Sequence, residues 1–167
     1  MDGIKEILAK ISSYNIFNYL LPGIVFAVIC KLGMGLDLVL ENNFLGAFLY
    51  YFIGLVVSRV GSVIIEPFLK WSKFLKFTDY KKYVQASKQD EKIELLSEVN
   101  NTYRTILSLI GILFCLKIYK HFNFLYWNIP HNVSYPIVLL FLLFLFLFSY
   151  RKQTGYITKR IDANLNP

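Results

Sequence analysis

Apolar residues dominate four long stretches of this 167-residue chain, and polar residues separate them. The stretches cover residues 19–36, 44–65, 105–119 and 133–150. The hydrocarbon core of a bilayer is about 30 Å thick, and a helix of about 20 residues crosses it at 1.5 Å per residue. The pattern therefore predicts an all-α fold, with one integral membrane domain over residues 1–167 and four membrane-spanning helices.

Positive charge is distributed unevenly around these stretches. Of the 18 Lys and Arg, 14 lie before the first stretch, between the second and third, or after the fourth. Short segments rich in Lys and Arg stay on the cytoplasmic side of membranes. We therefore expect both termini and residues 67–104 in the cytoplasm (N-in/C-in) and the 37–43 turn outside. Together with contacts to anionic membrane lipids, this bias accounts for the net charge of +7 without a nucleic acid.

Small residues mark one side of the second stretch and predict a close contact with another helix or with a second copy of the chain. Arg59 lies in the same stretch, and Glu66 is about 10 Å further along the axis, too far for a direct ion pair in one straight helix. Arg59 either reaches the inner interface or bonds a carboxylate or helix-end carbonyl of a neighbouring helix or subunit. The residues that we assign to intramembrane polar or oligomer contacts are Gly54, Ser58, Arg59, Gly61, Ser62 and Glu66.

Two asparagines open the first stretch. Asn15 or Asn18 can cap a helix N-terminus, with Pro22 in the first turn. Alternatively, both belong to a polar cluster among the helices; we favour capping. Cys30 and Cys115 fall within stretches and are interpreted as small buried residues, not as a disulfide or a metal pair.

Residues 67–104 contain one Pro and no Gly, and they keep helical periodicity. The pattern predicts a helix over 68–76, a break near Thr78 and a second helix capped by Asp79. Ser87 and Asp90 have the spacing of a capping box, which would open one helix over 88–119 that continues into the third span. Its apolar side carries Leu95, Leu96, Val99, Tyr103 and Ile106, and its opposite side carries Glu91, Glu94, Glu98 and Asn101.

A helix that leaves the membrane cannot keep this apolar stripe in water without a cover. The 68–84 helices, further copies of the chain in a homo-oligomer, or a cytosolic protein partner could supply it. We therefore assign partner docking to one set of residues on this helix: Glu91, Glu94, Leu95, Glu98, Val99, Asn101 and Tyr103.

Sequence motifs of catalysis are missing. The chain has no Gly-rich nucleotide loop, no His-Glu-x-x-His, no Cys-x-x-Cys and no Gly-x-Ser-x-Gly, and both histidines fall on the predicted outer side. We therefore expect no enzyme, no catalytic residue, no metal and no cofactor. Two function classes remain open: a non-catalytic scaffold or sensor that self-associates and recruits a cytosolic protein, and an oligomeric pore lined by Arg59, Ser58 and Ser62.

The overall plan resembles that of small four-span proteins encoded in bacterial anti-phage defence loci, in particular the membrane components of the Kiwa system. The resemblance covers the whole chain in outline and is carried by the span count, the N-in/C-in layout, the Asn-Tyr-Leu-Leu-Pro-Gly string at 18–23 and the helical segment 91–104. It implies a homo-oligomeric, tetrameric sensor in the bacterial inner membrane. Such a sensor would respond to phage attack and work with a soluble DNA-binding partner, without binding nucleic acid itself.

Overall fold

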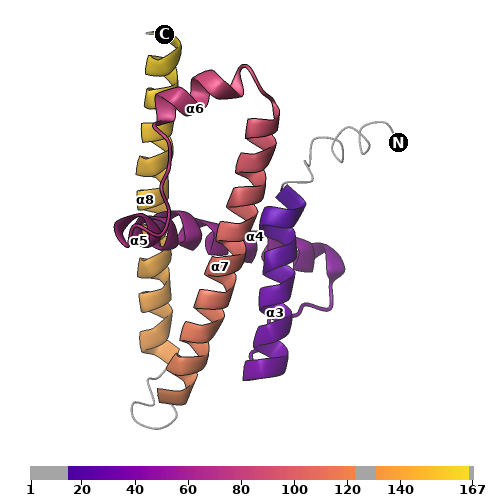
Figure 1. The fold of residues 1–167 in the computed structure, drawn as a ribbon. Helices are drawn as coiled ribbons and strands as arrows, with labels where there is room; N and C mark the ends of the chain where they lie inside the picture. Colours follow the sequence, from indigo (N-terminus) through magenta and orange to yellow (C-terminus); the bar gives the residue numbers. More distant parts are fainter. Residues whose placement is uncertain (1–14, 123–130, 166–167) are drawn as a thin grey trace, which may run out of the picture.

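The computed structural model describes residues 15–122 and 131–165, which form helices and connecting segments without a strand (Figure 1). Four helical segments are long and apolar enough to cross a membrane: Ile16–Met34, Asn43–Trp71, Lys92–Phe122 and Pro136–Asn164. The all-α class and the four long apolar helices of the prediction are confirmed. The aromatic 123–130 connection lies outside the described residues.

The first two candidate spans each contain a π-helical turn. The first joins η1 (Ile16–Leu20) to α3 (Leu21–Met34), and the second joins α4 (Asn43–Val60), η2 (Gly61–Ile65) and α5 (Glu66–Trp71). Each π turn ends two residues before a proline, Pro22 or Pro67. Proline lacks the backbone N–H and crowds the carbonyl four residues earlier, and a wider turn accommodates that interruption of the hydrogen-bond ladder.

The segment after Pro67 corrects one predicted helix. The helix expected over 68–76 ends at Trp71, and the chain is irregular from there to α6 (Tyr80–Ser87). Lys73 adopts a φ of 61°, a left-handed conformation that cannot continue a right-handed helix. The predicted cap at Asp79 is confirmed, because its Oδ1 accepts a hydrogen bond of 2.9 Å from the Lys81 N–H.

The last two helices are α7 (Lys92–Phe122) and α8 (His131–Leu165). Continuation of α7 into the third candidate span is confirmed, but the capping box is wrong. Ser87 closes α6 and donates to the Val84 carbonyl, whereas Asp90 accepts from the Lys92 N–H at 2.9 Å and caps α7. The fourth helix extends well beyond the predicted end at residue 150, because nothing in the following polar sequence interrupts it.

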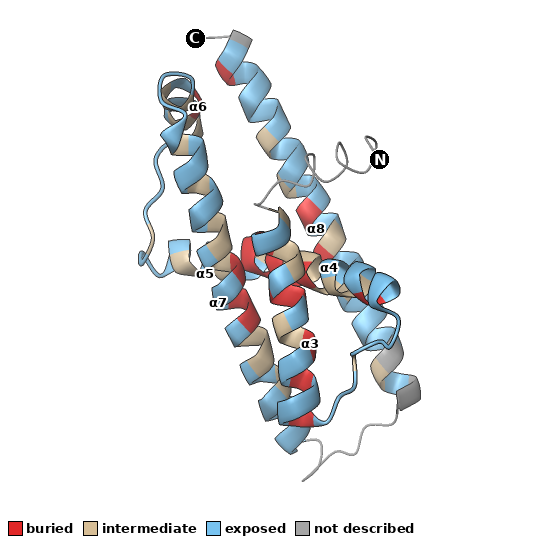
Figure 2. Cartoon of the chain, turned by 90° about the vertical axis from the view of Figure 1, so that its right-hand side faces the viewer, coloured by how far each residue is buried: buried red, intermediate tan, exposed pale blue. Residues whose placement is uncertain are grey.

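The continuous helix α4–η2–α5 runs across α7 and α8 instead of alongside them (Figures 1 and 2). On one side of this crossing lie α3 and the halves of α7 and α8 that are joined by residues 123–130. On the other side lie α6, the first turns of α7 and the last turns of α8. The small core sits where η1, α3, α4 and α7 meet, and Cys30 is buried there as predicted, whereas Cys115 is exposed.

Candidate functional site

The small residues of α4 and η2 allow backbone contacts within this one chain. A Cβ at Gly54 would lie 1.7 Å from the Tyr19 carbonyl oxygen, and one at Gly23 would lie 1.7 Å from that of Tyr50. At Gly61 a Cβ would lie 3.1 Å from the carbonyl oxygen of Arg104 on α7. The face predicted to meet another helix or another copy therefore contacts η1, α3 and α7 of the same chain.

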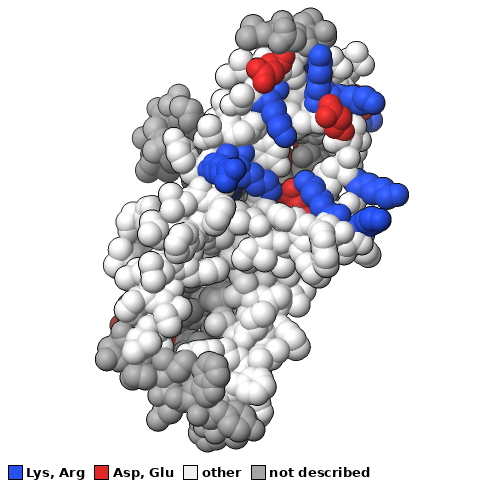
Figure 3. All heavy atoms as spheres, turned by 90° about the vertical axis from the view of Figure 1, so that its left-hand side faces the viewer, with Lys and Arg blue, Asp and Glu red and all other residues white. Residues whose placement is uncertain are grey.

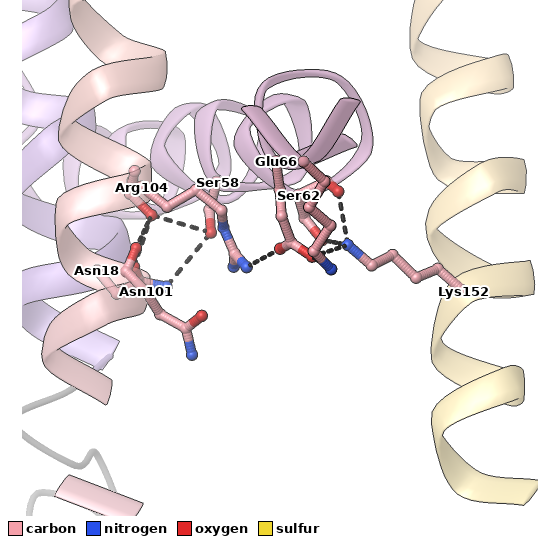
Figure 4. A network of polar contacts seen from close by, with 9 residues as sticks. Asn18, Ser58, Ser62, Glu66, Asn101, Arg104 and Lys152 are labelled. Atoms are coloured by element: carbon pink, nitrogen blue, oxygen red, sulfur yellow. Dashed lines mark hydrogen bonds and ion pairs between the residues drawn. The ribbon is translucent and has the colours of Figure 1, made fainter. Parts of the chain in front are cut away.

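Three buried polar side chains connect these helices (Figure 4). Asn18, Ser58 and Thr105 are each at most 1% exposed. The Thr105 hydroxyl lies 2.6 Å from Asn18 Oδ1 and 3.2 Å from Ser58 Oγ, and Asn18 Nδ2 donates to Ser58 Oγ at 3.3 Å. The favoured capping role of Asn18 is therefore wrong, because its amide joins η1 to α4 and α7. Asn15 precedes η1 without a side-chain capping bond.

A charged cluster lies one helical segment further on, around Glu66 at the start of α5. Glu66 is 4% exposed, and three cations from three helices surround its carboxylate. Arg104 of α7 lies at 2.7 Å, Lys70 of α5 at 2.8 Å and Lys152 of α8 at 3.2 Å. Lys152 also donates to the carbonyl (2.6 Å) and the hydroxyl (2.9 Å) of Ser62 (Figure 4).

The ion pairs of this cluster join α5 to α7 and α8. A carboxylate bonded by Arg and Lys makes short, strong hydrogen bonds, and their strength rises where water is excluded. One carboxylate nevertheless cannot neutralise three cations. The Glu66 cluster (Glu66, Lys70, Arg104 and Lys152) therefore keeps an excess of two positive charges, which would attract an anion.

In the single chain, the guanidinium of Arg59 donates to the Tyr19 hydroxyl at 3.3 Å, so its partner on the neighbouring helix is a phenol and not the predicted carboxylate or carbonyl. The other alternative, that Arg59 reaches the inner interface of the membrane, stays a prediction. Among the described residues Glu66 pairs with other cations and not with Arg59, in agreement with the distance expected along the helix.

The predicted docking stripe of α7 is uncovered in the single chain. Leu95, Leu96 and Tyr103 are 61%, 66% and 63% exposed, and Val99 is exposed as well. Of the covers considered, the 68–84 segment does not supply one for these side chains, because α6 extends from the start of α7 toward α8 (Figure 1) and leaves them exposed. On the acidic side Glu91, Glu94 and Glu98 are exposed, Asn101 is half-buried, and Glu94 lies 4.0 Å from Arg160.

Sequence reasoning missed Arg104, Thr105 and Lys152 as site residues. Each lies at the end of an apolar stretch, where interfacial placement is the ordinary expectation, and their partners are 38 to 90 residues away along the chain. Lys117 and Lys120 of α7 donate to carbonyls at the end of α3, those of Gly33 and Met34.

The turn between the first two candidate spans has its own ion pair. Asp37 and Lys31 lie 3.1 Å apart, and the hydrogen bond from Lys31, with a further one from the Val39 N–H, lowers the pKa of Asp37. Both side chains are well exposed, so water screens the pair and its contribution to stability is small.

In the part of the chain that the structure describes, no group of three or more His, Cys, Asp and Glu side chains gathers to hold a metal ion. Comparison with protein-family models, with curated proteins and with solved structures finds no match to this chain.

Proposed function

We propose that this protein is a non-catalytic, multi-pass membrane scaffold or sensor that self-associates and recruits a cytosolic protein. The observation that carries the proposal is the apolar stripe of α7 (Leu95, Leu96, Val99 and Tyr103), exposed on a helix that extends beyond the apolar part of the molecule. An exposed apolar patch of this kind marks a protein interaction site.

The placement of positive charge supports a cytoplasmic position for this stripe. In Figure 3 Lys and Arg gather around the middle and at one end of the molecule, and the other half of the visible face is largely uncharged. The charged end holds α6, the first turns of α7 and the last turns of α8. By the positive-inside rule that end faces the cytoplasm.

The acidic residues on the same stretch of α7 indicate the chemistry of the partner. Glu91 and Glu98 are exposed there, and the described residues give them no ion pair. A partner surface that covers the stripe with apolar residues and reaches around α7 with basic residues would match both features. An amphipathic helix with Lys or Arg along its rim is the simplest such surface.

Site-specific photo-crosslinking in the native host tests this proposal. A photoreactive residue replaces Leu96 in one variant and Leu139 in another; Leu96 is 66% exposed on α7 and Leu139 is 62% exposed in the apolar part of α8. We expect the Leu96 variant to crosslink a cytosolic protein, which mass spectrometry then identifies, and the Leu139 variant to crosslink lipid or other membrane chains. Crosslinking of the same soluble protein at both positions, or at neither, contradicts the proposal.

Self-association rests on the apolar surface that α7 and α8 leave exposed, which lipid or further copies would cover. Native mass spectrometry of protein extracted from its host membrane measures the subunit count. The defence setting in the bacterial inner membrane rests on the resemblance to Kiwa membrane components. Deleting the gene should then raise phage plating efficiency, and the variant Leu96→Gln/Val99→Gln should not restore protection.

The alternative function, a pore, was based on Arg59, Ser58 and Ser62 as its lining residues, and their contacts in the single chain do not favour that role. Ser58 and Ser62 are buried with partners inside the chain, and Arg59 is bonded to Tyr19. These side chains contact neighbouring helices of the same chain, so we do not assign them to a water-filled channel.

A further inference from the structure

A hollow of about 420 Å³ opens between η2–α5 and α8, directly beside the Glu66 cluster. Its lining includes three basic residues of α8, Arg151, Lys152 and Lys159, and three apolar residues, Val63, Pro67 and Phe148. This volume lies within the range of pockets that bind small ligands. The lining combines concentrated positive charge with an apolar wall, a combination that suits an amphipathic anion.

The charges around the hollow are not balanced within the chain. Lys152 shares the single carboxylate of Glu66 with Lys70 and Arg104. Arg151 and Lys159 are exposed, and no ion pair is formed by either of them with the described residues. The hollow and the adjoining Glu66 cluster together contain five cations and one carboxylate, which leaves an excess of four positive charges for an anion to neutralise.

The position of the hollow along α8 indicates where that anion comes from. The exposed apolar run of α8 ends at Phe148, and Arg151 follows within one turn. In Figure 3 the belt of Lys and Arg borders the uncharged half of the molecule. Basic residues at such a boundary meet the phosphates of lipid headgroups, while the apolar surface next to them contacts acyl chains.

We propose that this hollow binds the headgroup of an anionic phospholipid. Its phosphate contacts Arg151 and Lys159, and its acyl chains follow Phe148 and the apolar face of α8. Lys152 holds the side of the hollow in place through Ser62 and Glu66. The inference requires only that α8 crosses the membrane, and it is independent of a cytosolic partner.

Native mass spectrometry of the full chain in uncharged detergent tests the site, with phosphatidylglycerol and phosphatidylcholine as probes. The variant Arg151→Gln/Lys159→Gln removes two charges from the hollow. Its matched control, Lys81→Gln/Lys82→Gln, removes two charges from the exposed surface of α6. One Lys or Arg near an anionic surface contributes about 1 kcal/mol, so we expect the hollow variant to bind phosphatidylglycerol about 30-fold more weakly and the control to match the wild type.

A second variant distinguishes binding of the lipid inside the hollow from general electrostatic attraction of the lipid to the basic surface. Gly155 lines the hollow, and a Cβ there would meet no atom within 4 Å, so Gly155→Leu adds bulk at the lining without changing charge. We expect it to lose phosphatidylglycerol as well. Equal binding of the two lipids by the wild type, equal losses in the hollow and control double variants, or unchanged binding in Gly155→Leu would overturn the proposal. Displacement of phosphatidylglycerol by millimolar inorganic phosphate would assign the hollow to a soluble phosphate and overturn the lipid assignment.

Discussion

Glu66 is the residue on which the joint between α5, α7 and α8 depends. Among the described residues, Glu66 supplies the one carboxylate that pairs with these three cations, and Glu66→Gln removes its charge while keeping the size of the side chain. Removing one partner of a largely buried ion pair costs about 3–5 kcal/mol, because the remaining charges lose their compensation. We expect the apparent melting temperature in uncharged detergent to fall by about 6–20 °C.

Glu94→Gln is the matched control for this prediction. Glu94 is also a carboxylate near an arginine, but the pair is 4.0 Å apart and both side chains are more than half exposed. Exposed pairs contribute about 1 kcal/mol at most, so the melting temperature of this variant should stay close to that of the wild type. Similar losses in both variants would show that the cluster has no special role in stability.

Gly54 is required because the backbone of η1 passes directly above it. Gly54→Ala would place a methyl group 1.7 Å from the Tyr19 carbonyl oxygen, a distance that only separation of the two helices can relieve. We expect the purified variant to aggregate or to elute over a broad range in size-exclusion chromatography. Gly111→Ala is the control, because its Cβ meets nothing within 4 Å and Ala is the better helix former. A well-behaved Gly54→Ala variant would contradict this packing.

At the residue scale, the sequence predicted which positions were unusual but not what they contact. The small residues at Gly54, Ser58 and Gly61 were recognised from their spacing, which reports only that something approaches closely. Glu66 and Arg104 are 38 residues apart in the chain and meet only because two helices cross. The sequence around either residue contains no pattern that predicts where these two helices cross.

Among the elements, the connection between η1, α4 and α7 rests on Thr105. Thr105→Val keeps the shape of the side chain and removes the hydroxyl that lies 2.6 Å from Asn18 Oδ1 and 3.2 Å from Ser58 Oγ. Hydrogen bonds between membrane helices contribute about 0.6 kcal/mol on average and up to about 1.7. We expect a loss near the upper value, because the three side chains are almost fully buried.

Thr102→Val provides the comparison for the Thr105 variant. The Thr102 hydroxyl donates to the Glu98 carbonyl of its own helix, so its removal breaks no contact between helices. Both variants are compared by the temperature at which they lose monodispersity in the same detergent. If the two valine variants lose monodispersity at the same temperature, the hydrogen bonds of Thr105 to Asn18 and Ser58 make no measurable contribution to stability.

Element boundaries followed the sequence only where a local signal determined them. Asp79 was predicted correctly because capping needs one side chain and the next two residues. Ser87 has the same local features, but it closes α6, and Asp90 caps α7 in its place. The early end of α5 depends on the left-handed backbone conformation of Lys73. A lysine side chain gives no signal that predicts this conformation.

Over the whole molecule, the sequence predicted four long apolar helices but not their arrangement. Length and hydropathy report whether a helix is able to cross a bilayer, and α4–α5 satisfies both criteria. Its course across α7 and α8 depends on the glycine contacts with η1 and α3 and on the Glu66 cluster. Those contacts join residues far apart in the chain.

Cysteine labelling measures how this arrangement sits in the membrane. In a background with Cys30→Ala and Cys115→Ala, Glu41→Cys reports the turn before α4 and Lys81→Cys reports α6; both positions are exposed. With the N-in/C-in topology, a membrane-impermeant maleimide should label Glu41→Cys in intact cells, or in spheroplasts if an outer membrane blocks access. It should label Lys81→Cys only after the membrane that holds the protein is opened, because the positive-inside rule predicts a cytoplasmic position for α6. If Glu41→Cys is also labelled only after the membrane is opened, α4–α5 does not cross the bilayer. It then lies along the inner face of the membrane, as its course across α7 and α8 in the fold would allow. Three spans would then require the N-terminus to lie outside, and the Glu66 cluster would mark the inner boundary of the membrane.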